Sequence, residues 1–209
     1  MSETEEPKQA SKPDKLSPDN VLDSIFRDDG PMPPAKLGIR FLAFVMDAVL
    51  LLLISNFIIL KYAWPAAYPE AYTTYVAWFD SLATSLTSGA PLEPMDPQII
   101  EAFNYANSIQ LVVFWVYFAI GEAFFSGASL GKRMFRLRTV SMISLGNPSL
   151  FTAVFRAGAK AITVLSFFPI LLIASLVTIR FNKRRQMGHD LLNRTVVVDE
   201  KRMQQQNGA

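Results

Sequence analysis

The sequence predicts an all-α membrane protein with two full transmembrane helices and a third helical element that is broken by a proline. Three observations indicate this fold class. The 209 residues are 51% hydrophobic and have a mean hydropathy of +0.24. The apolar residues are pooled into three blocks instead of following the stripes of amphipathic helices. Basic residues gather beside these blocks, and the length suits one membrane domain.

The first apolar block covers residues 41–60 and contains one charged residue, Asp47. At about 1.5 Å per residue, a helix of this length crosses the roughly 30 Å hydrocarbon core of a bilayer. We therefore expect a transmembrane helix at about 40–60, followed by an aromatic belt at the interface. Pro65 is expected to stop this helix, because proline lacks the N–H that an interior helical bond needs.

Polar tails are expected on both sides of the membrane domain, which covers residues 37–198. Residues 1–36 contain several prolines and alternate acidic with basic side chains, so a disordered cytoplasmic tail is predicted. Residues 199–209 are rich in glutamine and predict a frayed C-terminal tail.

The second apolar block predicts a transmembrane helix at about 104–125, with Glu122 near its inner end. The long aromatic connection before it contains a stretch, Tyr72–Leu86, that is compatible with an interfacial helix. Residues 126–160 after it hold six basic residues and no acid. Because basic segments stay on the cytoplasmic side, this segment and the N-terminus are expected inside, against the anionic lipids of the inner leaflet.

The third apolar element, at about 150–180, leaves two alternatives open. Its uncharged part has Pro169 near the middle and is followed by a cluster of basic residues. A re-entrant hairpin that breaks at Pro169 returns this cluster to the cytoplasm, as the charge rule favours. A single kinked crossing is the other alternative. The hairpin predicts that Arg40 and Asp190 lie within salt-bridge distance.

Asp47 is the charge that most needs an explanation. An aspartate at this depth costs about 2.5–3.5 kcal/mol on insertion scales, so a partner is expected. Either Asp47 binds a cation or proton in a transport path, or it is a structural carboxylate held by a basic side chain or by hydroxyl groups. His189 and Asp190 leave a similar choice, between a proton relay and a helix cap with a salt bridge to Arg184 and Arg185.

Three segments resemble the RDD family of membrane proteins. They are IRFLAFVMD in the first helix, GASLGKRMFRLRTV after the second, and NKRRQMGHDLLNRTVVV near the end. The resemblance covers about Lys36 to Val198. It implies that Arg40 is the family's arginine and that Asp47 and Asp190 are its two aspartates. It also implies transport of unidentified ligands, since some members of the family resemble cation/proton antiporters.

The composition excludes several kinds of chemistry. The chain has no cysteine and one histidine, so thiol catalysis, disulfides and multi-histidine metal sites are excluded within one chain. GASLGKR lacks the spacing and the Ser or Thr of a phosphate-binding loop. We expect no enzyme activity, no cofactor, no metal site and no nucleic-acid partner. The alternating LRTV and RTVVV segments are compatible with a short β-ribbon.

Two functions remain for a protein that we expect in the bacterial inner membrane. A transporter of a cation or other small ligand would work as a homo-oligomer, because three apolar blocks are too few to enclose a path. A non-catalytic adaptor or assembly subunit would use its basic cytoplasmic surface to bind a partner in a membrane complex. The predicted transport or structural charge cluster is Arg40, Asp47 and Asp190, and the secondary candidates are Glu122, Lys132, Arg133, Arg184, Arg185 and His189.

Overall fold

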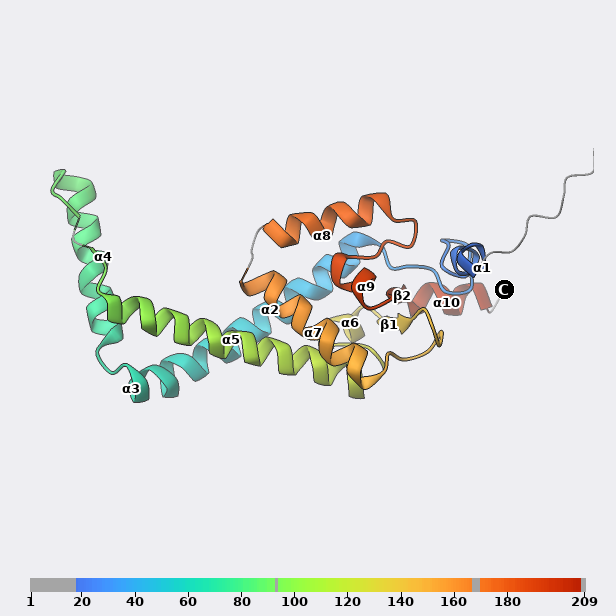
Figure 1. Ribbon diagram of the computed structural model, residues 1–209, viewed down its shortest axis with the longest axis horizontal. Helices are drawn as coiled ribbons and strands as arrows, with labels where there is room; N and C mark the ends of the chain where they lie inside the picture. The colour runs from blue at the N-terminus through green and yellow to red at the C-terminus, as the bar shows by residue number, and fades with distance from the viewer. Residues whose placement is uncertain (1–17, 93, 167–169, 208–209) are drawn as a thin grey trace, which may run out of the picture.

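The computed structural model describes residues 18–92, 94–166 and 170–207, and this part of the chain is mostly helical (Figure 1). Long helices form the centre of the molecule, and a module of short helices and strands lies at one end. The elements are α1 (Pro18–Ile25), α2 (Leu37–Ile58), η1 (Ile59–Ala63), α3 (Trp64–Ala67), α4 (Ala71–Ser88), α5 (Pro97–Phe124), α6 (Leu130–Met134), β1 (Leu137–Ser141), α7 (Leu150–Leu165), α8 (Ile170–Phe181), α9 (Gly188–Leu192), β2 (Thr195–Asp199) and α10 (Glu200–Asn207).

Two helical segments are long and apolar enough to cross a membrane, Leu37–Ala67 and Pro97–Phe124. The two predicted transmembrane helices are therefore confirmed as long apolar helices. They pack together through Leu51 of the first and two phenylalanines of the second, Phe114 and Phe118. Their other faces expose large apolar side chains, as contact with lipid tails requires. Examples of these exposed side chains are Phe41, Leu53, Phe57, Val112 and Trp115.

The first long helix passes through Pro65, so the prediction that this proline stops it is wrong. A π-helical turn, η1, lies directly before the proline, and the Trp64 N–H donates to the carbonyl oxygen of Ile59, five residues earlier. A π turn is wider than an α turn and interrupts the regular ladder of hydrogen bonds. The missing N–H and the ring of Pro65 are therefore accommodated, and the helix continues to Ala67.

The second long helix begins at Pro97, earlier than the predicted start at about residue 104. Asp96 caps it, since its carboxylate accepts a hydrogen bond of 2.8 Å from the Gln98 N–H. An aspartate cap followed by proline in the first turn is a typical helix start. The helix expected near Tyr72–Leu86 is confirmed as α4, which leads away from the long helices at the end of the molecule opposite the strands (Figure 1).

The third apolar element consists of two separate helices, α7 and α8. The two helices run in opposite directions (Figure 1). Pro169, the predicted break, lies outside the described residues. Helix α7 begins at Ser149, whose hydroxyl accepts from the Thr152 N–H, and it packs on α5 through fully buried alanines. These alanines are Ala153, Ala157 and Ala161.

The predicted ribbon is present: β1 pairs with β2 in antiparallel register, with Thr139 opposite Val197. A two-stranded ribbon is marginal alone, and here the segment before α2 supports it. The Ala35 N–H donates to the carbonyl oxygen of Val197, and the Asp199 N–H donates to that of Pro33. The two ends of the domain therefore meet on one small sheet.

The described residues of both tail segments contain short helices, α1 and α10. From Pro18 onward the N-terminal segment belongs to the fold, because Phe26 is buried against Val196 and Val198 of β2. These scattered apolar residues are too few for a core of their own, and the ribbon supplies the other half of the apolar contact. At the C-terminal end, Glu200–Asn207 form α10.

Candidate functional site

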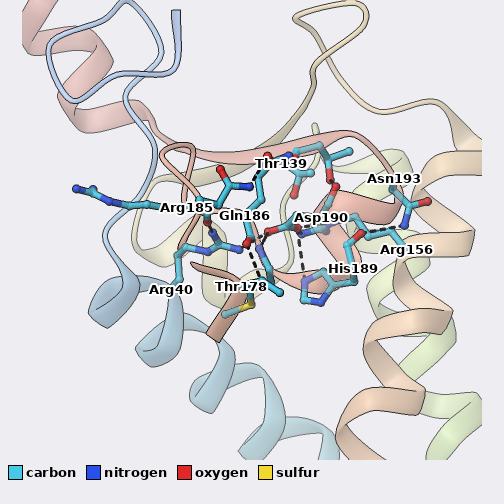
Figure 2. Close-up of polar contacts among 12 residues, drawn as sticks. Arg40, Thr139, Arg156, Thr178, Arg185, Gln186, His189, Asp190 and Asn193 are labelled. Carbon is cyan, nitrogen blue, oxygen red and sulfur yellow. Dashed lines mark hydrogen bonds and ion pairs between the residues drawn. The ribbon is translucent and has the colours of Figure 1, made fainter. Parts of the chain in front are cut away.

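A cluster of buried charged residues lies where the long helices meet the module of strands and short helices. We call it the ion cluster. Its members come from α2, α5, α6, α7 and α9, so segments far apart in the sequence meet here. Figure 2 shows three of these members, Arg40, Arg156 and Asp190. The ion cluster consists of Arg40, Asp47, Glu122, Lys132, Arg156, Lys160 and Asp190, all of them buried.

Asp190 lies between two arginines, as Figure 2 shows. Arg40 Nη2 is 2.5 Å from one carboxylate oxygen, and Arg156 Nη2 is 2.5 Å from the other. The Met187 N–H also donates to Asp190 over 3.0 Å, so this carboxylate caps α9. The contact predicted between Arg40 and Asp190 is therefore observed, and Arg156 joins it as a residue that the sequence analysis missed.

The charge of Asp190 is stable because of these neighbours. Complete burial alone raises the pKa of a carboxyl group. The guanidinium groups of Arg156 and Arg40 act in the opposite direction and hold the pKa of Asp190 well below its usual value. Asp190 is therefore ionised at neutral pH.

Glu122 forms the second centre of the ion cluster. Its carboxylate accepts from Arg156 Nη1 and lies 2.8 Å from Lys132 Nζ. The same ammonium donates to the Thr139 hydroxyl on β1. Arg156 thus connects both acids, and the pairs join α5 and α7 to α6, α9 and the ribbon. Glu122 meets bases, as expected for the inner end of its helix.

Asp47 is held differently, by uncharged donors. The Tyr117 hydroxyl donates over 2.6 Å, the Ser129 hydroxyl over 2.5 Å and the Gly131 N–H over 2.8 Å. Among the described residues, no basic side chain forms an ion pair with Asp47. Three donors already occupy its oxygens, which is the arrangement of a structural carboxylate.

Helix α6 approaches α2 very closely at this point, and glycine makes the approach possible. A Cβ on Gly131 would overlap the carbonyl oxygen of Ala43 and touch the carboxylate of Asp47. Without a side chain, the Gly131 N–H comes within hydrogen-bond distance of Asp47. The glycine of the LGKR segment therefore serves close packing and not phosphate binding.

Four secondary candidates are not members of the ion cluster, and three of them are arginines that interact elsewhere. Arg133 is exposed and stacks over the ring of Phe125. Arg184 pairs with Asp23 at 2.6 Å, and Arg185 pairs with Asp28 at 2.8 Å. The predicted salt bridge from these two arginines to Asp190 is therefore wrong. The reason is that the N-terminal segment, expected to be disordered, supplies their acidic partners.

His189 is buried beside Asp190, with Nε2 3.5 Å from the carboxylate. Burial lowers the pKa of His189 to about 3, even though Asp190 acts in the opposite direction. The imidazole is therefore neutral in the folded protein at neutral pH. In the unfolded chain its pKa is near 6.5. Below that pH the unfolded state binds a proton that the folded state does not bind, so stability falls as the pH drops.

We expect His189 to lower the stability of the folded protein in mild acid, at pH values above those at which carboxylates take up protons. Between about pH 7.5 and pH 5, the melting temperature of the wild type should fall more than that of His189→Gln, because glutamine cannot take up a proton. Thermal unfolding of both proteins in the same detergent at several pH values measures the difference. Equal slopes for the two proteins would contradict the neutral, buried state of His189.

A cavity of about 70 Å³ adjoins the ion cluster. Its volume exceeds the roughly 10–15 Å³ that seats one water molecule. Side chains from α2, α6, α7 and α9 line it, and Asp47 and Lys160 lie on the same cavity. The charged or titratable residues in its wall are Arg40, Asp47, Lys132, Arg156, Lys160 and His189. Within the described residues, no group of three acidic, histidine or cysteine side chains is arranged to hold a metal ion.

Several residues of the site were not predicted as members of it. Arg156 and Lys160 were counted only as basic residues of an inner segment. Their spacing of four residues on a helix was a usable signal, because it puts both on the face that carries the buried alanines. Tyr117 and Ser129 had no comparable signal, since only the packing of α5 and α6 against α2 brings their hydroxyls to Asp47.

The fold and the site together define a class of protein: a small helical membrane protein with a buried ion cluster at one end of two long apolar helices. The RDD family model matches residues 34–194, and the chain belongs to the RDD family. No curated protein and no solved structure matches the chain.

Proposed function

We propose that this protein transports a small ligand across the membrane, and that its ligand site is the cavity beside the ion cluster. The observation that carries the proposal is the cavity itself, which lies among buried ionisable side chains at the inner end of two candidate spans. Ionisable groups in such a setting are costly and are commonly part of a substrate or ion path. The ligand is small, because the cavity has a volume of only about 70 Å³.

The contacts between the two ends of the domain support a re-entrant third element. Pro33 and Ala35 lie before α2, yet both are hydrogen-bonded to β2. The ends therefore share one side, which requires an even number of crossings between them. Two crossings by α2 and α5, with α7 and α8 as a hairpin that enters and returns, meet this condition. A single kinked crossing of the third element would give an odd number.

The proposal includes a homo-oligomer. Two spans cannot enclose a continuous polar path, and the cavity is too small to cross the bilayer. The long helices also expose large apolar side chains over most of their surface. A second copy could cover part of this surface and complete the path, whereas lipid would cover the rest.

In this proposal Asp47 is structural and is not the group that binds a transported cation. A bound cation needs oxygen lone pairs, and three donors already take those of Asp47. Its role is to hold α6 and α5 against α2, which shapes the wall of the cavity. This assignment replaces the ion-site hypothesis for Asp47 but keeps transport as the function.

An adaptor or assembly subunit is the second candidate, and one observation favours it. The module of strands and short helices exposes basic side chains that have no role in the ion cluster. A basic surface of this kind suits an acidic protein partner or anionic lipid. The exposed bases are Arg27, Lys36, Arg133, Arg136, Lys183, Arg194 and Lys201.

Asp47→Asn tests these alternatives. The side-chain NH₂ group of the new asparagine would face the hydroxyl and N–H groups that donate to Asp47 in the wild type. We therefore expect a loss of about 1–3 kcal/mol in stability and a lower yield of folded protein. In proteoliposomes, flux per folded molecule should stay near the wild-type value for sodium, potassium, protons and chloride. Asp80→Asn is the matched control, because Asp80 is exposed on α4.

Two results would contradict this reading. Full yield with flux lost would restore Asp47 as an ion site. A well-folded wild type that moves none of these ions would remove the support for ion transport and favour the adaptor.

A further inference from the structure

Lys160 is the one base of the ion cluster that forms no direct ion pair among the described residues. Its side chain is 8% exposed, and within the described residues its ammonium forms no hydrogen bond and no ion pair. The ammonium instead lies 3.4 Å from the centre of the Phe118 ring and 5.2 Å from that of Phe44. Aromatic faces stabilise a cation, so these rings favour the charged form, but they do not neutralise it.

A count of formal charges shows that the ion cluster has more basic than acidic side chains. Its three acids are Asp47, Glu122 and Asp190, whereas four basic side chains face them. Arg40, Arg156 and Lys132 are engaged with Asp190 and Glu122 in direct ion pairs. Asp47 is held by uncharged donors. The cluster therefore carries one positive charge in excess, and Lys160 is the base whose ammonium makes no direct ion pair among the described residues.

The cavity is where a compensating negative charge fits. Lys160 lines it together with three further bases, Arg40, Lys132 and Arg156, and with one carboxylate, Asp47, which accepts from three donors. The rest of the wall is mostly apolar, with Phe41, Phe44 and Val164 among its residues, so water screens the charge poorly there. An unpaired buried charge is costly, and a small anion beside it would offset that cost.

We propose that this cavity binds a small monovalent anion, with the Lys160 ammonium as its principal charged contact. Chloride and formate represent the class, because they carry one charge and suit a volume of about 70 Å³. This inference rests on the proposed function only in one respect, namely that the bound anion is the transported ligand. The cavity can bind an anion whether or not that anion then crosses the membrane.

Chloride binding is measured directly by the broadening of the ³⁵Cl NMR line with the purified full chain in detergent. Gluconate, which is too large for the cavity, keeps the ionic strength constant. The wild type should give a saturable broadening that formate displaces. Lys160→Met should abolish the saturable part, because methionine keeps much of the side-chain volume without the charge. Lys61→Met is the matched control, since Lys61 is exposed on the first long helix, and it should bind chloride like the wild type.

Thermal unfolding separates anion binding from a purely structural role of Lys160. In gluconate alone, Lys160→Met should be at least as stable as the wild type, because it removes an uncompensated buried charge. Added chloride should raise the melting temperature of the wild type and leave that of Lys160→Met unchanged. A variant that is less stable in gluconate would assign Lys160 a structural role and overturn the proposal.

The outcomes for this site and for transport are distinct. Absence of saturable broadening in the wild type, or its persistence in Lys160→Met, would overturn the anion site even if the liposomes show flux. Saturable binding that depends on Lys160 supports the site, and binding without chloride flux in proteoliposomes would count against the proposed transport alone.

Discussion

Asp190→Asn is expected to prevent most of the protein from folding. The substitution removes the negative charge between Arg40 and Arg156, which leaves the buried Arg40 without an acidic partner and Arg156 with Glu122 alone. Removing one partner of a buried ion pair typically costs about 3–5 kcal/mol, which is a large part of the stability of a small domain. The yield of monodisperse protein after detergent extraction and its melting temperature measure the loss.

Two further variants make this prediction specific. Asp80→Asn makes the same chemical change at an exposed position and should leave yield and melting temperature unchanged. Adding Arg40→Met to Asp190→Asn removes the charge that has lost its acidic partner, so part of the lost stability should return. Wild-type stability of Asp190→Asn would show that the ion cluster contributes little to folding.

Gly131→Ala is expected to be nearly as damaging, for a steric reason. The added Cβ would overlap the carbonyl oxygen of Ala43, which belongs to the backbone of α2 and cannot rotate away. Helix α6 must then move outward, and the hydrogen bond from the Gly131 N–H to Asp47 is lost. Overpacking usually costs about 1–3 kcal/mol, and the upper end is expected for a backbone contact.

Gly38→Ala is the matched control for this variant. Gly38 is exposed on α2, the helix that Gly131 approaches. No atom lies within 4 Å of the position that an added Cβ would take. Alanine there should leave the melting temperature unchanged or raise it, since glycine costs a helix about 0.5–1 kcal/mol relative to alanine. Equal effects of the two substitutions would contradict the close approach of α6 to α2.

The two long helices were predictable because length and apolar composition alone determine them. The partner of Arg40 was also predictable. The basic residues after the third element favoured a hairpin, and a hairpin puts Asp190 on the same side as Arg40. The start of α5 was also predictable from the Asp96-Pro97 pair, which is typical of a helix start. The predicted start was later because it followed the apolar block alone.

Other features depend on packing that no local pattern carries. The partners of Asp47 are hydroxyl and amide donors on α5 and α6, 70 to 84 residues away in the sequence. The order of residues 18–36 depends on a ribbon whose strands come far later. Lys160 was visible as a base, but its isolation depends on how Arg156 and Lys132 divide the acids between them.

The separation of the paired residues also sets an order of events during synthesis. The donors to Asp47 follow it by 70 to 84 residues, whereas Asp190 follows Arg40 by 150. As the nascent chain leaves the ribosome, Asp47 can be satisfied once α5 and α6 have been made, and Arg156 can pair with Glu122 once α7 has followed, but Arg40 waits for the last part of the domain. A chain that ends anywhere before α9 would therefore leave the Arg40 guanidinium without a carboxylate.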